Sequence, residues 1–424
     1  MGVCENKGEK LNYRFPIKCI TGLVMNRYFT FLIVVAFLMV LTASSFFHLL
    51  PFLRSNEAQP FYVGVSFCGD TIHEAKLLID RVKDYTNLFV LQSGPISKNE
   101  TALNEICDYA VESELDIIVY FGWFDPEHPW QLPWLDYAKQ RWGDRFLGVY
   151  YYDEPGGIQI DNDWRHLFTR IQQRNSTIYQ SIRPVIEAYL NGTLPRDYNE
   201  AAKRFIEVIQ NDPGIKELKE RSITTFTSDY AIYWFDYLGG YDVLLAQLGW
   251  NHSIVQSIDL VRGAARMQNK SWGTIITWKY EKSPYLASGD EIYQQMRMSY
   301  EAGAEYVVIF NYPKIKDNPY GVMFDEHFDA LYRFWNGVVQ NPKVIHGSIQ
   351  AEAALILPRN YGWGMRHPDD KIWYWGSDEK SLQIWKIYQK LIEKYGLRLD
   401  IIYDDPAFPV AERYPQMYYW NHTY

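Results

Sequence analysis

Cysteine is scarce in this chain of 424 residues, which contains only four. Cys4 and Cys19 precede the longest hydrophobic run, whereas Cys68 and Cys107 follow it. Four cysteines at these spacings make no disulfide framework, although the second pair could form a bridge. Cysteine and histidine also lack the close spacing that zinc sites need, so we assign no metal and no cofactor.

Positive charge is also in short supply. The chain has 42 Lys and Arg against 51 Asp and Glu, which gives a formal net charge of −9. The part that follows the hydrophobic run contains no basic stripe. Proteins that bind nucleic acid usually carry such a stripe, so we expect no nucleic-acid partner.

Aromatic residues, in contrast, are abundant: they make up 17% of the chain, with 34 Tyr and 15 Trp. Chains of this kind bury some rings in the core and use others as contact surface. Sugar-binding clefts and protein interfaces both use aromatic platforms, so the composition alone does not separate these two uses.

One long hydrophobic run stands near the N-terminus. Residues 28–47 carry no charge, and hydrophobic residues continue to Leu53. This length is that of a bilayer-spanning helix. A basic leader at 1–27 precedes it and predicts a cytoplasmic N-terminus. A cleaved signal peptide, with a site near Ser44, is the alternative, but the leader is long for one. We favour an uncleaved signal anchor over 28–53, which places the rest of the chain outside the cell.

Acceptor triplets for N-glycosylation support this topology. All six follow the hydrophobic run and none precedes it, which is typical of an exported glycoprotein. They begin at Asn99, Asn175, Asn191, Asn251, Asn269 and Asn421. We therefore expect a single-pass protein of the cell membrane with an extracellular main domain.

Apolar runs of strand length recur through the next part of the chain, mostly with helix-like segments between them. The runs cover Phe61–Phe67, Asn87–Gly94, Asp116–Trp123, Phe146–Tyr152, Thr224–Ala231, Val243–Gly249, Gly273–Tyr280 and Tyr306–Tyr312. Eight parallel strands are the number that closes a (β/α)8 barrel. An open doubly wound sheet is the alternative, but Ser66–Asp70 lacks its Gly-rich fingerprint, and no P-loop pattern is present.

The predicted domain organisation follows from this rhythm. We expect a barrel over 59–345 with a helical insertion at 158–222, because the fourth crossover is overlong. A small α/β module of Rossmann or flavodoxin type is expected over 350–424. Its strands are predicted at Ala351–Leu357, Leu399–Tyr403 and Gln416–Trp420, and its helix at Leu382–Tyr395.

The stretch Phe146–Gly157 is the strongest candidate for chemistry. It is a strand that ends in Asp153 and Glu154 and is then broken by Pro155, Gly156 and Gly157. In a barrel, the carboxyl ends of the strands carry the active site. Alternation predicts that Leu147 and Val149 face the helices, and that Gly148, Tyr150, Tyr152 and therefore Glu154 face the barrel.

Glycosidic cleavage uses two carboxyl groups. We assign Glu154 as general acid, with Asp153 beside it tuning its proton affinity. The alternative is that Asp153 caps the next helix and Glu154 is solvated. Asp229, close to the end of the fifth strand, is the leading second carboxylate, followed by Glu281 just beyond the seventh strand and Asp125 beyond the third. Polar and aromatic strand ends supply the predicted substrate-binding residues Gln92, Trp123, Tyr152, Tyr230, Trp234, Trp278 and Asn311.

These features together resemble a glycoside-hydrolase-type (β/α)8 barrel protein with a C-terminal α/β module. Thr227–Tyr237 and Tyr361–Arg366 are also similar to segments of surface-anchored archaeal proteins of that architecture. The resemblance covers about residues 59–424 and implies a partner that is a glycan or polysaccharide. It leaves two functions open: a glycoside hydrolase, or a non-catalytic barrel that binds carbohydrate or belongs to a cell-envelope assembly. A pair of carboxylates across the barrel mouth, roughly 5 to 10 Å apart, would favour the enzyme.

Overall fold

The computed structural model describes residues 60–161, 177–410 and 413–422. The expected leader at 1–27 and anchor at 28–53 lie outside these residues. Among the residues that are described, no helix is both long enough and apolar enough to cross a membrane.

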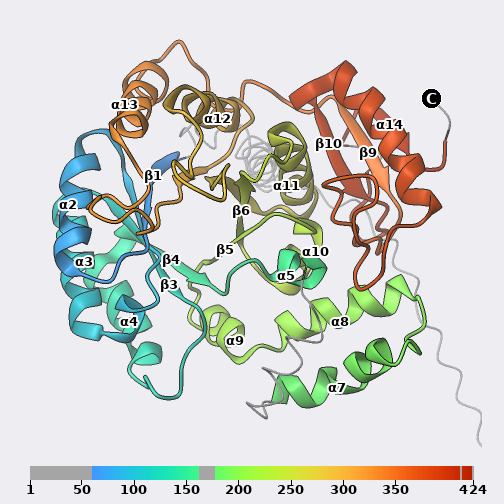
Figure 1. Cartoon of the computed structure of the whole chain (residues 1–424), viewed down its shortest axis with the longest axis horizontal. Helices are drawn as coiled ribbons and strands as arrows, with labels where there is room; N and C mark the ends of the chain where they lie inside the picture. Colours follow the sequence, from blue (N-terminus) through green and yellow to red (C-terminus); the bar gives the residue numbers. More distant parts are fainter. Residues whose placement is uncertain (1–59, 162–176, 411–412, 423–424) are drawn as a thin grey trace, which may run out of the picture. The chain divides into compact units, whose positions relative to one another are not determined.

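Eight parallel strands form a closed barrel in sequential order, and β1 pairs with β8 to complete the circle (Figure 1). The strands are β1 (Tyr62–Phe67), β2 (Leu88–Leu91), β3 (Asp116–Phe121), β4 (Phe146–Tyr151), β5 (Thr225–Asp229), β6 (Val243–Leu248), β7 (Ser271–Ile276) and β8 (Tyr306–Ile309). Each lies within a run expected from the sequence, or starts within two residues of it. The prediction of a (β/α)8 barrel is therefore confirmed.

Helices surround the barrel. They are α2 (Ile72–Val82), α3 (Glu100–Glu112), α4 (Gln131–Trp142), α5 (Pro155–Asp161), α10 (Tyr233–Gly239), α11 (Ile254–Gln268), α12 (Gly289–Glu301) and α13 (Asp325–Phe334). Thr71, Asn99 and Ser253 accept backbone N–H groups at the starts of α2, α3 and α11. Ser288 and Glu291 form a capping box on α12. Such caps satisfy N–H groups that have no partner inside the helix.

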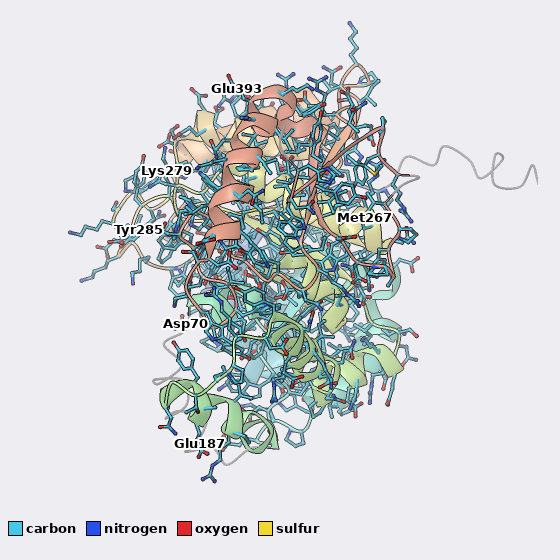
Figure 2. All side chains as sticks on the ribbon, turned by 90° about the vertical axis from the view of Figure 1, so that its right-hand side faces the viewer. Asp70, Glu187, Met267, Lys279, Tyr285 and Glu393 are labelled. Atoms are coloured by element: carbon cyan, nitrogen blue, oxygen red, sulfur yellow. The ribbon has the colours of Figure 1, made fainter. Side chains whose placement is uncertain are left out.

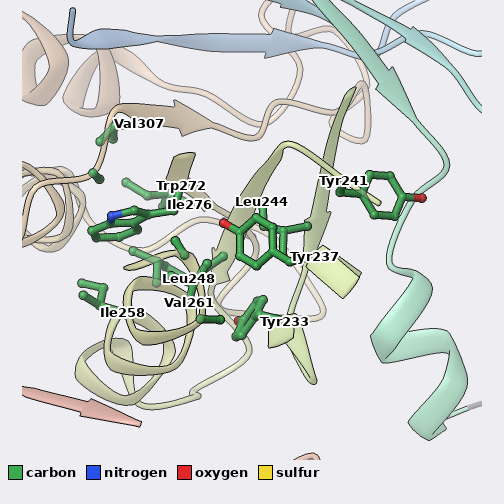
Figure 3. Close-up of a cluster of buried hydrophobic side chains, with 14 of the residues drawn as sticks. Tyr233, Tyr237, Tyr241, Leu244, Leu248, Ile258, Val261, Trp272, Ile276 and Val307 are labelled. Atoms are coloured by element: carbon green, nitrogen blue, oxygen red, sulfur yellow. The ribbon is translucent and has the colours of Figure 1, made fainter. Parts of the chain in front are cut away.

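Two hydrophobic layers hold the barrel together. The inner layer fills its centre with Leu88, Val90, Ile118, Tyr150, Phe226, Val243, Leu245, Ile275, Tyr306 and Val308. The outer layer lies between the strands and the helices, and Figure 3 shows its part around Leu248, Ile258 and Trp272. A filled centre of this kind makes the barrel a packed core with its open chemistry at the strand ends.

One expectation for β4 is wrong. Leu147 packs against the inner layer instead of the helices, although Val149 and Tyr150 lie on the outer and inner sides as expected. The cause is an irregularity where β4 pairs with β3, which places one extra residue in β4. Gly148 adopts the backbone angle φ +151 next to the extra residue. A Cβ at this position would lie 2.2 Å from the carbonyl oxygen of Thr224. A strict alternation of sides cannot anticipate such a bulge.

The crossover from β4 to β5 is long. After α5, its described residues form α7 (Thr177–Leu190), α8 (Tyr198–Gln210) and α9 (Pro213–Glu220). Asp197 and Asp212 cap α8 and α9. In α8 the apolar residues share one face, which packs against α10 beside the barrel. In the view of Figure 2, α7 with Glu187 lies at the lower edge of the drawn side chains.

A second sheet follows the barrel. It contains β9 (Ala353–Leu357), β10 (Leu399–Tyr403) and β11 (Gln416–Tyr419), in the parallel order β10-β9-β11, with α14 (Glu379–Tyr395) between β9 and β10. In Figure 2, α14 lies near the top with Glu393 on its exposed side. The small C-terminal α/β arrangement is therefore as expected.

This C-terminal sheet packs directly on the barrel helix α11. A Cβ at Gly263 of α11 would lie only 2.7 Å from the carbonyl oxygen of Ile401, so the glycine allows the close approach. Arg262 of α11 is buried and donates to Asp400 at 2.7 Å and to the carbonyl of Leu399 at 2.8 Å. The contact therefore contains a buried ion pair as well as apolar packing.

Candidate active site

A pocket of about 170 Å³ opens at the carboxyl ends of the barrel strands. The described residues that line it come from six of the eight strands or from the residues that directly follow them. They are Gln92, Asp153, Glu154, Ser228, Gln247, Trp250, Ile275, Thr277, Trp278, Phe310 and Tyr312. This is the position where barrel enzymes carry their active sites.

Asp153 is held by hydroxyl groups from two neighbouring strands. Tyr150 of β4 donates a short hydrogen bond to Oδ1 of Asp153, and Ser228 of β5 donates to the same oxygen at 3.2 Å. The two hydroxyls are themselves 2.7 Å apart. Burial raises the pKa of Asp153, and both hydroxyl bonds oppose that rise because they stabilise the charged carboxylate. Asp153 is thus fixed in orientation and remains part of the pocket wall.

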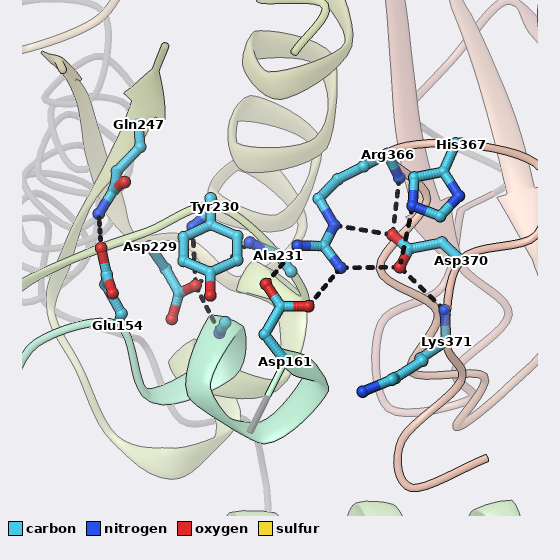
Figure 4. Close-up of polar contacts among 11 residues, drawn as sticks. Glu154, Asp161, Asp229, Tyr230, Ala231, Gln247, Arg366, His367, Asp370 and Lys371 are labelled. Atoms are coloured by element: carbon cyan, nitrogen blue, oxygen red, sulfur yellow. Dashed lines mark hydrogen bonds and ion pairs between the residues drawn. The ribbon is translucent and has the colours of Figure 1, made fainter. Parts of the chain in front are cut away.

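Glu154 follows in the left-handed backbone conformation, with φ 53. Its N–H donates to the carbonyl of Ser228 at 3.1 Å, and its Oε1 accepts from Nε2 of Gln247 at 2.6 Å (Figure 4). Left-handed non-glycine residues are uncommon and cluster at functional sites. Burial, and then the charge of Asp153, raise the pKa of Glu154 to about 7, while Gln247 opposes this rise. Glu154 can therefore give or take a proton near neutral pH.

Asp229 has a different environment. It is fully buried and accepts four backbone N–H groups, from Gly156 at 2.6 Å, Gly157 at 2.8 Å, Tyr230 at 2.7 Å and Ala231 at 3.2 Å. Burial, and then the nearby charge of Glu154, raise its pKa. Its contacts fix the turn that follows Glu154. Asp229, the predicted second carboxylate, lies behind the turn and is not among the residues that line the pocket.

Asp236 of α10 lies next to Asp229 and was not predicted as a site residue. It is fully buried, and its carboxyl group faces that of Asp229. Burial, and then the charge of Asp229, raise its pKa well above the ordinary value. Asp236 is thus a buried carboxyl behind the site.

Three buried polar atoms of the pocket wall have no partner within the described residues. They are Oε1 of Gln92, Oγ1 of Thr277 and Nε1 of Trp278. Buried polar groups in proteins are nearly always hydrogen-bonded to protein, water or ligand. Each of these atoms is itself buried within the wall, and the residues that carry them add an amide, a hydroxyl and an indole ring to the pocket lining.

Aromatic rings form the wall on the side of β6, β7 and β8. Trp278 lies with its ring centroid 6.0 Å from Trp250, 6.3 Å from Phe310 and 6.0 Å from Tyr312. Trp250 and Tyr312 are each about two-fifths exposed, although they line the pocket. Exposed ring faces beside polar groups can pack on the apolar face of a sugar while its hydroxyls find partners.

Acidic groups occur on only one side of the pocket. Among its described lining residues, Asp153 and Glu154 are the only carboxylates, and they are adjacent in the chain. Thr277 and Trp278, after β7, and Phe310 and Tyr312, after β8, are neutral. The described part of the pocket wall therefore offers no second carboxylate across from Glu154.

Two of the predicted substrate-binding residues, Gln92 and Trp278, line the pocket. Trp234 instead is buried in the outer core, where its ring centroid lies 5.5 Å from those of Tyr403 and Phe408. Asn311 is also buried, and its Oδ1 accepts the N–H of Val322 at 3.0 Å. These two side chains hold the fold together near the site.

Tyr230 lies outside the pocket wall, between α5 and the C-terminal module (Figure 4). The guanidinium of Arg366 is 5.4 Å from its ring centroid. Arg366 bridges Asp161 at the end of α5, with bonds of 2.5 and 2.7 Å, and Asp370 of its own loop. Arg366 thus links the C-terminal module to the end of α5, the helix that directly follows Glu154.

Trp123 and Tyr152 are each more than two-fifths exposed, and neither is among the described residues of the pocket wall. In contrast, five residues that were not assigned to the site line the pocket. They are Ser228, Gln247, Trp250, Thr277 and Tyr312. All five lie at strand ends, which is the one signal in the sequence that could have pointed to them.

No protein-family model matches the chain, and no curated protein matches it. Solved structures do. The GH5_18 protein from Streptomyces cattleya, in complex with GlcNAc, has 10% identity and a TM-score of 0.51, and the match covers 86% of this chain and 99% of that one.

Two further matches cover less of the chain. Endo-1,4-beta-mannanase from Eisenia fetida has 11% identity and a TM-score of 0.39, with 66% of this chain and 92% of that one covered. A 3-hexulose-6-phosphate synthase has 12% identity and a TM-score of 0.33, with 64% and 99% covered. Likeness at such identities concerns the fold and leaves the chemistry open. The chain is a (β/α)8 barrel protein whose structural neighbours include glycoside hydrolases.

Proposed function

We propose that this protein acts on glycans, and that a sugar residue enters the pocket with its glycosidic oxygen at Glu154. One observation carries the proposal: a carboxyl with a pKa of about 7 shares a pocket with amide and hydroxyl side chains and with exposed aromatic rings. A general acid with a pKa near the working pH is what protonation of a leaving oxygen needs. The GH5_18 neighbour, solved with GlcNAc, supports a sugar as ligand.

The second candidate is a catalytically silent barrel that binds carbohydrate or serves in a cell-envelope assembly. Its support is the lack of a second carboxylate among the described residues of the pocket wall. Hydrolysis by the two common routes requires such a group. The two candidates share the glycan ligand and differ in whether a bond is broken.

A screen of the full-length chain against a panel of glycans separates these possibilities. We expect at least one glycan to bind and to be cleaved, and Glu154→Gln to retain binding while turnover is lost. Glu281→Gln is the matched control, because Glu281 is exposed and does not line the pocket. Binding without cleavage by the parent protein would favour the silent barrel, and the absence of both would reject the glycan proposal.

We further propose that the protein is anchored in the cell membrane with the barrel outside. The uncharged run at 28–47, the basic leader before it and the six acceptor triplets after it support this topology. Protease added to intact cells should remove the barrel and spare about the first 25 residues. Protection of the barrel from the protease would contradict the topology.

A further inference from the structure

The one-sided distribution of carboxylates limits the chemistry of the pocket. A retaining glycosidase needs a carboxylate nucleophile, and an inverting one needs a carboxylate base on the other face of the sugar. Asp153 and Glu154 follow each other at the end of β4, whereas the wall formed after β7 and β8 is neutral. A sugar between these walls would meet carboxyl groups on one side and aromatic rings on the other.

Asp153 and Glu154 each keep one oxygen without a bond inside the described protein. Tyr150 and Ser228 occupy Oδ1 of Asp153, and Gln247 occupies Oε1 of Glu154. In the part of the chain that the structure describes, Oδ2 of Asp153 and Oε2 of Glu154 have no hydrogen-bond partner. Two neighbouring carboxyl groups, each held in place through its other oxygen, can therefore meet two groups of one substrate.

We propose that this site cleaves 2-acetamido-2-deoxyhexosides, with the acetamido carbonyl oxygen of the substrate as nucleophile, Glu154 as general acid and Asp153 as acceptor for the acetamido N–H. This inference rests on the proposed action on glycans and names the substrate class. A nucleophile carried by the substrate accounts for a pocket whose described lining residues include no second carboxylate across from Glu154, and substrate assistance is an established exception to the two-carboxylate rule.

The chemistry balances in two steps. The acetamido carbonyl oxygen forms a bond to the anomeric carbon while the glycosidic bond breaks. The electron pair of the glycosidic bond leaves with the glycosidic oxygen, which takes the proton of Glu154. Asp153 accepts the hydrogen bond of the N–H as positive charge develops on the resulting oxazolinium ring. Water then attacks the anomeric carbon and gives a proton to the Glu154 carboxylate, and the ring opens to restore the acetamido group.

This route also fixes stereochemistry. The acetamido group reaches the anomeric carbon only from the face opposite the leaving group, so the glycoside must be 1,2-trans. Two successive displacements then return the product with the configuration of the substrate. The site should therefore accept one anomer of a given 2-acetamido sugar and retain its configuration.

The test uses the full-length chain and 4-nitrophenyl glycosides of both anomers in pairs that carry either 2-acetamido or 2-hydroxyl. We expect the 1,2-trans acetamido compound to be cleaved with retention, and the hydroxyl compound to react at least ~10³-fold more slowly, because an attached nucleophile has a high effective concentration. Replacement of acetamido hydrogens by fluorine should lower kcat stepwise, because fluorine withdraws electrons from the carbonyl oxygen.

Asp153→Asn separates a role in the reaction from a role in folding. We expect kcat to fall ~10²- to 10³-fold on the acetamido substrate, with little change in KM or in the melting temperature. The matched control is Asp70→Asn, an exposed carboxylate after β1 that is labelled in Figure 2. It should leave kcat unchanged.

Each outcome bears on one of the two claims. Cleavage of the 2-hydroxyl glycoside as fast as its acetamido partner, or inversion of configuration, would overturn substrate assistance and leave action on glycans standing. Binding of acetamido sugars without turnover would overturn it as well. If none of the sugars is bound or cleaved, the proposed function fails and this inference with it.

Discussion

Gln247 of β6 donates a hydrogen bond of 2.6 Å to Oε1 of Glu154, which follows β4. The same amide nitrogen lies 3.0 Å from the hydroxyl oxygen of Ser228 on β5. Three strands thus meet at one amide group. The bond favours the charged form of Glu154, while burial and the charge of Asp153 favour the neutral form more strongly. Gln247 therefore both orients the candidate acid and limits the rise of its pKa.

Removal of this bond should be visible in the pH dependence of the reaction. Gln247→Ala takes away a contact that lowers the pKa of Glu154, so the descending limb of the rate profile should move to higher pH. The parent limb is expected at about pH 7. We also expect kcat to fall about 10-fold, because the carboxyl loses its fixed orientation.

The profile of kcat against pH, measured on a cleaved glycan, checks this prediction. Gln350→Ala, in an exposed turn before β9, is the control and should reproduce the parent profile. A limb that moves to lower pH, or does not move, would show that Gln247 does not act on the proton of Glu154.

The aromatic wall gives a second prediction. Trp250→Ala should weaken glycan binding about 10-fold, equivalent to about 1.4 kcal/mol, because a ring face of the pocket is lost. Trp123→Ala should leave the affinity unchanged, since Trp123 is exposed but lies outside the lining residues. Isothermal titration of both variants with the same glycan compares the two rings. If both variants lost the same affinity for the glycan, the sugar would contact Trp123 as well as the pocket.

The contact between barrel and C-terminal sheet is expected to stabilise the fold. Asp400 is fully buried and accepts from Arg262 at 2.7 Å and from the hydroxyl of Tyr414 at 2.7 Å. Asp400→Asn removes the closer of two buried carboxyl partners of Arg262, since Asp259 lies at 3.4 Å, and should lower the free energy of unfolding by about 3 kcal/mol.

Denaturant unfolding, followed by tryptophan fluorescence, measures this loss. Glu352→Gln is the matched control, because its ion pair with Arg398 is about half exposed on both sides. Such pairs contribute roughly 0–1 kcal/mol. If the two variants lose the same stability, the buried pair at α11 does not hold the module to the barrel.

The barrel could be predicted because its strands are buried on both faces and read as apolar runs between turn residues. Runs such as Val243–Gly249 and Tyr306–Tyr312 give the number of strands, and eight strands with helices between them leave few topologies. Glu154 could be located for a related reason. A carboxylate directly after a barrel strand must lie at the mouth, whatever its neighbours are.

The rest of the site depends on distant parts of the chain. Asp229 also lies at a strand end, as the last residue of β5, but the N–H groups of Gly156 and Gly157 bind its carboxylate. No local sequence pattern predicts this contact between distant segments. Trp234 is buried because Tyr403, far along the chain, packs against it. Residue type and position in the sequence identify such residues as candidates. Whether a candidate lines the pocket depends on which distant segments of the chain pack over it.

The central claim is that Glu154 supplies the proton to the leaving oxygen. Its most direct test is kcat/KM of the parent and of Glu154→Gln on two substrates of one sugar, a natural glycoside and an activated aryl glycoside with a good leaving group. We expect Glu154→Gln to lose ~10²- to 10⁴-fold on the natural glycoside and much less on the activated one, which needs little protonation. Full activity of Glu154→Gln on the natural glycoside, or equal losses on both substrates, would contradict it.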